Sequence, residues 1–305
     1  MIKPNTSHWF LLLFLVGLFS AGSLQASTPW WAKNKAIANR SLQLNNGPAF
    51  MGFKDEVQSP RAYLGKGWGM GVGYERIQLK KIYSTEIQFY SGMVTNQQSS
   101  RLGLNVADCY GFQANSARLW RVKAALGRLQ WYAGYGTQAY MQIRDNAALE
   151  NGSLGYDAML GLGGVSRLEF PFRLKSDKTY RFWIFKYTRA AYRPIRIGWQ
   201  LELPVVAAHL RTPYIGLHNT LGNDPNAGIR QDLKENLNVT LAGNYLYLKN
   251  QLYAHYFLKN GNALSLQWQW TGYAYEQNNQ ATRSANSQLL VGLRIKLDTH
   301  PEQRR

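Results

Sequence analysis

The segment Ile195–Ala207 reads Ile-Arg-Ile-Gly-Trp-Gln-Leu-Glu-Leu-Pro-Val-Val-Ala and alternates apolar with polar or small side chains. Successive side chains of a β-strand point to opposite faces of the sheet, whereas a helix would mix the two sets around its circumference. The pattern therefore predicts a strand with one apolar face, formed by Ile195, Ile197, Trp199, Leu201, Leu203, Val205 and Ala207. The other face carries Arg196, Gly198, Gln200 and Glu202.

Other segments repeat this two-residue period. It is clear at residues 237–241, 264–271 and 289–297. Weaker alternation predicts strands near residues 68–78, 82–94, 107–124, 129–143, 155–169, 180–192, 210–219 and 251–258. We therefore expect an all-β fold, a transmembrane antiparallel β-barrel of about twelve strands, or fourteen if two weak segments were missed.

Composition favours a membrane barrel over a soluble β-sandwich or barrel, although the soluble alternative stays open. The mean hydropathy of −0.36 is too polar for a bundle of membrane helices, but only alternate residues of a barrel strand face lipid. Trp and Tyr also recur toward predicted strand ends, as the interfacial girdles of membrane barrels require. These residues are Trp120, Trp131, Trp183, Trp199, Trp270, Tyr245 and Tyr247.

The first residues have the anatomy of an export signal. Lys3 precedes an apolar stretch at Trp9–Phe19, and small residues follow it. We predict a signal peptide over residues 1–26, with the mature N-terminus between Gly22 and Ser27, which mass spectrometry can check. An exported barrel of this kind is expected in the outer membrane of a Gram-negative bacterium.

The remaining chain divides into three predicted parts. Residues 27–66 lack the alternation and could be a periplasmic lead-in, a plug in the lumen or one more strand. Residues 67–298 hold the predicted barrel, and a polar tail occupies residues 299–305.

Two short motifs carry a family resemblance. The stretch Ser59–Gly65 leads to Gly73-Tyr74-Glu75-Arg76, and Leu201–Val205 is followed by Thr212-Pro213-Tyr214. These segments resemble an uncharacterised family of predicted outer-membrane β-barrels known mainly from Bacteroidetes and catalogued as a domain of unknown function. The resemblance would cover residues 55–298. It implies an outer-membrane barrel and brings no activity, cofactor or site residues.

The chain is strongly basic, with 35 Lys and Arg against 17 Asp and Glu. Lys and Arg are concentrated in residues 118–196. Because a charge facing mid-bilayer lipid is costly, these side chains must face the lumen, the loops or the headgroup rims. We predict Arg196, Gln200, Glu202, Arg294 and Lys296 as lumen or anion-facing residues. The expected partners are outer-membrane lipid and lipopolysaccharide, and anionic small solutes as an alternative; the exported context argues against nucleic acid.

Candidate catalytic features are weak. The glycines at every second position of Gly65–Gly73 continue a strand pattern, so they do not predict a phosphate-binding loop. The lone Cys109 is expected to be buried and unreactive. Of the histidines His209, His218, His255 and His300, we consider His218 and His255 as a possible base, but the local sequence places no serine and polar orienting group beside either one. We therefore predict no catalytic residue, no metal site and no cofactor.

Three functions remain open from the sequence. The first is a passive pore or structural membrane component with a basic polar lumen or rim. The alternatives are a lipid-modifying enzyme of the phospholipase or deacylase type, and a partner-binding barrel without transport. An open polar lumen would favour the pore, a filled lumen the structural or binding role, and a serine beside a histidine at a lipid-facing edge the enzyme.

Overall fold

The computed structural model describes residues 40–56, 59–78, 80–96, 106–122, 129–146, 154–175, 179–182, 185–188, 192–211, 237–242, 245–258, 260–277 and 280–297. Within these ranges the chain forms β-strands throughout. They are β1 (Arg40–Asp55), β2 (Ser59–Ile77), β3 (Lys81–Asn96), β4 (Val106–Arg121), β5 (Gln130–Asp145), β6 (Leu154–Lys175), β7 (Thr179–Phe182), β8 (Phe185–Thr188), β9 (Tyr192–Arg211), β10 (Leu237–Leu241), β11 (Tyr245–Phe257), β12 (Ala263–Gln277) and β13 (Gln280–Lys296).

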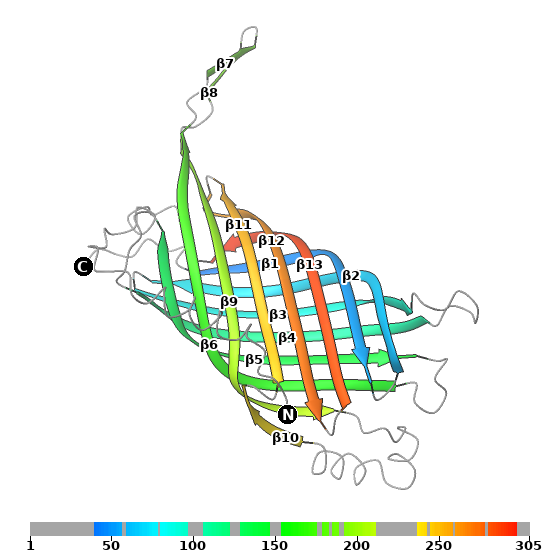
Figure 1. Ribbon diagram of the computed structural model, residues 1–305. Coiled ribbons are helices and arrows are strands. Elements are labelled where there is room, and N and C mark those ends of the chain that lie inside the picture. The colour runs from blue at the N-terminus through cyan, green and yellow to red at the C-terminus, as the bar shows by residue number, and fades with distance from the viewer. Residues whose placement is uncertain are drawn as a thin grey trace.

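Ten of these strands close into a barrel (Figure 1). Their order is β9-β11-β12-β13-β1-β2-β3-β4-β5-β6, and β6 pairs back onto β9. Every pairing is antiparallel, for example Asn45 with Gly292 of β13 and with Gly71 of β2. Closure satisfies the backbone donors and acceptors within the sheet and removes its free edges.

The predicted number of twelve to fourteen strands is too high. The segment 180–192 forms the hairpin of β7 and β8 with the start of β9, and 237–241 is β10, which lies outside the ring of ten. The strand predicted at 210–219 contributes only the end of β9, because residues 212–236 lie outside the described ranges. Short alternating segments in the connections resemble strands of the barrel, so a prediction from alternation alone gives too many barrel strands.

The predicted barrel boundary at residue 67 is too late. Residues Arg40–Asp55 form β1, which pairs with β13 on one side and β2 on the other. Of the three options, one more strand is therefore correct for residues 40–55, and residues 59–66 belong to β2. Residues 27–39 lie outside the described ranges. The sequence pattern did not predict β1, because Pro48 lacks an amide donor and interrupts the pattern. Gly47 and Pro48 accordingly have no partner residues in the register with β13. The predicted signal peptide and polar tail lie outside the described residues.

The barrel has an apolar exterior and a polar interior. Exposed apolar side chains lie on every part of the wall, including Leu44, Met70, Phe89, Leu160, Leu266 and Val291. Buried side chains include many glutamines and charged groups, such as Gln88, Gln269, Arg144 and Glu169. A soluble barrel has the opposite arrangement, with apolar residues inside. The soluble alternative therefore does not fit this distribution.

The predicted faces of β9 hold up to Val205 and then change. Ile197 and Val205 are exposed, while Arg196 and Gln200 are buried. The pairing with β6 shifts register between Leu162 and Gly163, opposite Pro204. Beyond this irregularity Val205 and Val206 are both exposed and Ala207 is buried. The assignment of Ala207 to the lipid face is therefore wrong, because one extra residue reverses the alternation.

At the same irregularity, the neighbour of β9 on its other side changes from β11 to β10. Ile195–Glu202 of β9 pair with β11, whereas Val206–Leu210 pair with the short strand β10. β10 thus lies outside the ring of ten at one end of the wall, as Figure 1 shows.

β6 and β9 extend beyond their neighbours at the other end. Pairing of β6 with β5 stops at Glu169, but pairing with β9 continues to Lys175 opposite Tyr192. β9 still pairs with β11 as far as Ile195, so the two-stranded arm consists of Arg173–Lys175 paired with Tyr192–Pro194 and is roughly 10 Å long. The hairpin of β7 and β8 follows it, away from the barrel (Figure 1).

The predicted aromatic girdle is correct only in part. Trp120, Trp199 and Trp270 are half-buried at positions that alternate with inward side chains. Tyr245 and Tyr247 instead lie inside the barrel, where they are 6% and 0% exposed. A tyrosine near a strand end can face either the lipid or the lumen, and the register of β11 decides which of the two it faces.

Candidate functional site

The candidate site is the barrel interior, where inward side chains meet at three levels. We call the end at which β1 begins and β13 ends the terminal end, and the other end the opposite end. At the terminal end, the Glu75 carboxylate accepts hydrogen bonds from Arg167 at 2.5 Å, from Arg196 at 2.9 Å and from Arg294. These four residues come from β2, β6, β9 and β13, so the cluster joins distant parts of the ring.

Glu169 and two aromatic side chains complete this terminal-end cluster. Arg167 Nη2 lies 2.8 Å from Glu169 Oε1, and the Tyr253 hydroxyl donates to the same oxygen at 3.0 Å. Arg167 Nε donates to the Tyr253 hydroxyl at 2.6 Å. His255 stacks on Tyr253 and has its Nδ1 3.0 Å from Arg196 Nη2. Charge-assisted hydrogen bonds of this kind fix the side chains in one arrangement.

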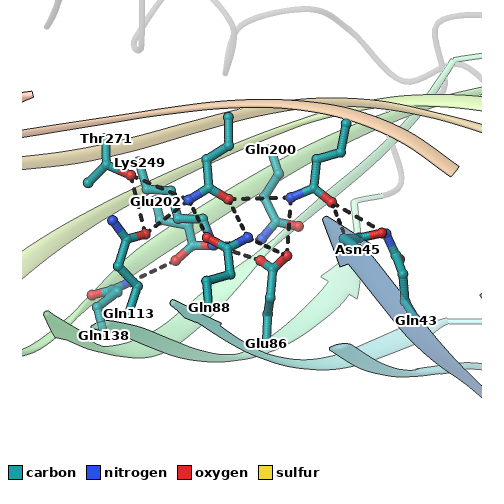
Figure 2. Close-up of polar contacts among 12 residues, drawn as sticks. Gln43, Asn45, Glu86, Gln88, Gln113, Gln138, Gln200, Glu202, Lys249 and Thr271 are labelled. Carbon is teal, nitrogen blue, oxygen red and sulfur yellow. Dashed lines mark hydrogen bonds and ion pairs between the residues drawn. The ribbon is translucent and has the colours of Figure 1, made fainter. Parts of the chain in front are cut away.

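The middle level is a network of amides (Figure 2). Gln88 of β3 and Gln269 of β12 exchange two hydrogen bonds, at 2.8 and 2.6 Å. Gln269 Nε2 also lies 2.9 Å from Gln113 Oε1 of β4. Asn45 donates to Gln267 at 3.1 Å, and Gln267 donates to Glu86 at 3.1 Å. An amide both donates and accepts, so a chain of amides can bridge the lumen without net charge.

One ion pair crosses the same level. Lys249 Nζ of β11 lies 2.8 Å from Glu86 Oε2 of β3 and 3.9 Å from Glu202 Oε1 of β9. The Lys249 side chain is 0% exposed. Glu202 in turn accepts a hydrogen bond from Gln200 at 2.8 Å. A buried ammonium requires such partners, because an unpaired charge in this surrounding would be strongly unfavourable.

The third level, toward the opposite end, has two arginines and two aspartates. Asp55 accepts from Arg144 at 2.8 Å and from Arg211 at 2.5 Å. Arg144 Nη2 also lies 2.6 Å from Asp157 Oδ2. All four side chains are at most 7% exposed. The strands involved are β1, β5, β6 and β9, so this level again links separate parts of the wall.

His209 lies beside this third level among tyrosines. Its ring stacks on Tyr275 with centroids 4.7 Å apart and meets the edge of Tyr245 at 4.6 Å. Its Nδ1 is 3.3 Å from the Tyr273 hydroxyl. His209 Nδ1 therefore lies within hydrogen-bond distance of a tyrosine, Tyr273, and His255 Nδ1 lies within that distance of an arginine, Arg196. A lipid-modifying enzyme would instead need a serine beside one of these rings.

The glycines of β2 leave space in the interior for side chains of the neighbouring strands. They face inward, and a Cβ atom added at Gly69 would lie 2.4 Å from the Gln288 side-chain oxygen. At Gly67 the added atom would lie 1.9 Å from the backbone oxygen of Ser91. Side chains and backbone of the neighbouring strands therefore occupy the space along this face of β2.

The described interior is neutral overall. Its buried bases are Arg144, Arg167, Arg196, Arg211, Lys249 and Arg294, and its acids are Asp55, Glu75, Glu86, Asp157, Glu169 and Glu202. Six bases thus face six acids. The expectation of a basic lumen does not hold for this part of the chain, because each arginine cluster surrounds internal carboxylates. The basic excess of the sequence must lie elsewhere.

The predicted site residues are placed as follows. Arg196, Gln200, Glu202 and Arg294 are buried inside the barrel, at 2%, 6%, 2% and 3% exposure. Lys296 is half-buried at the terminal mouth of the lumen. Arg196 and Arg294 share Glu75, whereas Gln200 and Glu202 join the middle level. Whether any of them binds an external anion stays a prediction.

Sequence reasoning missed the partners of these residues. Glu75, Glu86, Arg167 and Lys249 carry the crossing ion pairs, yet none was singled out. Their signal was available in part, since Glu86 and Gln88 alternate with Ile87 and Phe89 in β3. The alternation gives the face of each residue but not its partner across the barrel.

A small cavity remains between the terminal-end and middle levels. Its volume is about 60 Å³, and its lining includes Glu75, Glu86, Gln200, Tyr253 and His255. That space admits a few water molecules. The described residues contain no cluster of three or more His, Cys, Asp or Glu suited to a metal ion. Cys109 is buried, as predicted, and accepts a hydrogen bond from Gln142 at 3.2 Å.

The comparisons with known proteins give similarity in structure only. No family model and no curated protein matches the chain, so the family resemblance stays a prediction. The outer membrane protease OmpT from Escherichia coli is similar at 9% identity, with 85% of this chain and 97% of that chain covered and a TM-score of 0.49. The transport unit of the autotransporter AIDA-I from Escherichia coli has 9% identity, coverages of 96% and 99%, and a TM-score of 0.37. The toluene transporter TodX from Pseudomonas putida has 9% identity, coverages of 90% and 94%, and a TM-score of 0.32. Similarity at this level does not bear on function.

The location follows from the barrel itself. Closed β-barrels cross a bilayer because every backbone polar group of the wall is paired within the sheet. The exterior is apolar, with Leu44, Val72 and Leu266 among its exposed side chains, as lipid contact requires. The chain is an outer-membrane β-barrel. Among the described residues, no helix is long and apolar enough to cross a membrane.

Proposed function

We propose that the protein is a structural component of the outer membrane whose barrel is closed to solutes, rather than a passive pore. The observation that supports this proposal is that side chains from facing walls are bonded to each other at three successive levels of the lumen. A pore with an open lumen would instead line its wall with polar groups that face water.

The bonds at these levels cross the barrel rather than follow its wall. β11 and β3 lie half a ring apart, and Lys249 joins Glu86 across that distance. β9 and β2 are also half a ring apart, and Arg196 joins Glu75. The cavity of about 60 Å³ between the terminal-end and middle levels is too small to pass a hydrated solute. A conducting state would have to separate several buried ion pairs at once.

Separating those pairs would be costly. Removing one partner of a buried ion pair costs about 3–5 kcal/mol, since a charge is left without compensation. The three levels act in series, so all of them must open for a solute to pass. This arrangement favours a rigid wall over a gated channel.

Conductance across a planar lipid bilayer tests the proposal. The purified barrel should insert without producing stable single-channel steps, while an open porin in the same bilayer supplies the positive control. Insertion is verified by the compact, heat-modifiable form of the recovered protein. Steady ohmic steps from the wild-type barrel would show that the lumen conducts and would refute the closed state.

The arm formed by β6 and β9 favours a second candidate, a barrel that presents this arm to a partner. A two-stranded ribbon is marginally stable by itself in water, and within the described residues Arg173–Lys175 and Tyr192–Pro194 pair only with each other. Native gel electrophoresis of mild membrane extracts tests the idea. The wild type should migrate in a larger complex than a variant that lacks the hairpin, and equal mobility would remove this candidate.

A further inference from the structure

Charge is distributed unequally between the two ends of the barrel. The described acidic residues lie either inside the barrel or at the opposite end, where Glu56, Asp108, Asp145 and Glu276 are exposed. The terminal end carries Arg40, Arg76, Lys80, Lys81 and Arg118 outside the lumen. Its outer surface is therefore basic, and the described part of the chain supplies no carboxylate there.

An ordered row of side chains crosses this basic surface. Arg76 of β2 pairs with Tyr83 of β3, and Tyr83 pairs with Arg118 of β4. Arg40 and Tyr135 continue the row on β1 and β5. The neighbours Glu75, Ile82 and Leu119 point inward, so the row lies on the outer wall.

The central part of the row is held in place by aromatic rings. The Arg118 guanidinium lies 5.2 Å from the Tyr83 ring centroid and 5.4 Å from that of Trp120. Trp120 in turn packs against Tyr135 at 5.5 Å. Neither Arg76 nor Arg118 forms an ion pair with a described carboxylate. Two cations therefore face outward without an internal counter-charge, and aromatic rings hold Arg118 in place.

The row borders the apolar exterior. On β2 the next outward position is Tyr74, which is 38% exposed, while on β3 and β4 the polar pair Thr85 and Ser116 comes first. Ile87 of β3, which is 41% exposed, follows one step further along the strand. Such a border of arginine and tyrosine against lipid-facing residues lies at headgroup depth. Strand spacing places Arg76 and Arg118 about 10 Å apart with Tyr83 between them. Long arginine side chains can converge from that separation on one phosphate and bind it in bidentate fashion.

The sequence adds further charge to the same end. The strands of the arm and its hairpin carry Arg173, Lys175, Arg181, Lys186 and Arg193. A concentration of Lys and Arg at one membrane surface attracts anionic lipid.

We propose that Arg76, Tyr83 and Arg118 form an external binding site for the phosphate of an anionic phospholipid. β1 begins and β13 ends at this surface, which assigns it to the periplasmic side from which an exported chain inserts. That leaflet presents phospholipid headgroups rather than lipopolysaccharide. The inference rests on the membrane-spanning barrel proposed above, but it does not depend on whether the lumen conducts.

Native mass spectrometry of the purified barrel in detergent tests the site, with dioleoylphosphatidylglycerol and dioleoylphosphatidylcholine as probes. The wild type should retain phosphatidylglycerol in preference to phosphatidylcholine. The double variant Arg76→Gln/Arg118→Gln should lose about tenfold in affinity for phosphatidylglycerol, since two charge-assisted contacts disappear. Arg76→Lys/Arg118→Lys should retain part of the preference.

A matched control removes the same charge at the opposite end. Lys66 and Arg283 are exposed on the outer wall there, so Lys66→Gln/Arg283→Gln should leave phosphatidylglycerol retention unchanged. Heat-modifiable mobility verifies that each variant is folded. Equal retention in both double variants, or no preference over phosphatidylcholine in the wild type, would overturn the site. Lipopolysaccharide retention that falls while phosphatidylglycerol retention does not would overturn the choice of phospholipid.

Discussion

Glu75 shows how much one side chain can determine inside this barrel. Its carboxylate is the common acceptor of Arg167, Arg196 and Arg294, which come from three other strands. The arginines lie close together only because this carboxylate, with Glu169, compensates their charge. Glu75 therefore connects β2 to β6, β9 and β13 through its side chain.

Replacing Glu75 should be severe. Glu75→Gln leaves Arg167 and Arg196 with Glu169 and removes the carboxylate that pairs with Arg294, so it should destabilise the barrel by about 3–5 kcal/mol. Glu56 offers the control, because its pair with Lys54 is exposed and Glu56→Gln should leave the denaturant midpoint nearly unchanged. Denaturant midpoints in lipid vesicles give both values. Equal midpoints for the two variants would mean that the terminal-end cluster does not stabilise the fold.

Leu201 and Gln200 test the facing of β9. Leu201 lies on the lipid side midway along the strand, so Leu201→Arg should destabilise the barrel by roughly 2–4 kcal/mol. Gln200 points inward beside Glu202, so Gln200→Arg should cost less. Folding yield and denaturant midpoint in vesicles compare the two. A larger loss for the inward position would show that the strand is turned the other way.

The glycine face of β2 shows how one strand makes space for its neighbours. Gly67 pairs with Gly92 of β3, and the backbones approach so closely that neither position has room for a Cβ atom. The strand thus contributes little side-chain volume and leaves the lumen to Gln88 and Gln288. Packing on one strand depends here on the absence of side chains on the next.

The same substitution at two glycines separates this effect from a general preference for glycine. Gly67→Ala should destabilise the barrel by about 1–3 kcal/mol, because its Cβ would overlap the Ser91 carbonyl. Gly164→Ala meets nothing within 4 Å and should be neutral or stabilise by about 0.4–1 kcal/mol. Equilibrium unfolding in vesicles measures both. Similar effects at the two positions would contradict the close approach at Gly67.

The hairpin of β7 and β8 should be dispensable for folding. Within the described residues these strands pair only with each other, while Lys175 lies opposite Tyr192 at the base of the hairpin. Replacing residues 176–191 with Asn-Gly, which suits a two-residue hairpin turn, should preserve the barrel. Heat-modifiable mobility checks this result. Loss of the compact form would assign the hairpin a role in folding.

The closed ring predicts how the whole protein behaves. It should fractionate with the outer membrane and migrate faster on gels before heating than after it, because a sheet without free edges resists detergent. The internal ion pairs reinforce that resistance, since they connect walls that share no backbone hydrogen bonds. Recovery as a soluble periplasmic monomer without detergent would contradict the membrane barrel.

The sequence alone determined the class of fold and most strand faces. The period of two at Ile195–Val205 gives which side chains face lipid, because alternation is a local property of an extended chain. Local patterns could not give the strand number, since Pro48 obscured β1 and the hairpin at 180–192 imitated a barrel strand. They also placed Ala207 on the wrong face, because the irregularity near Pro204 arises from the pairing with β6.

Only the tertiary structure decided what fills the barrel. The sequence shows Glu75, Arg196 and Arg294 as separate polar positions, and each would suit an open basic lumen equally well. Closure of the ring brings them together from strands far apart in the chain, so their charges compensate each other. Residues that meet across a lumen have no fixed spacing in sequence. For that reason a neutral, filled interior and a basic outer rim could be distinguished only in three dimensions.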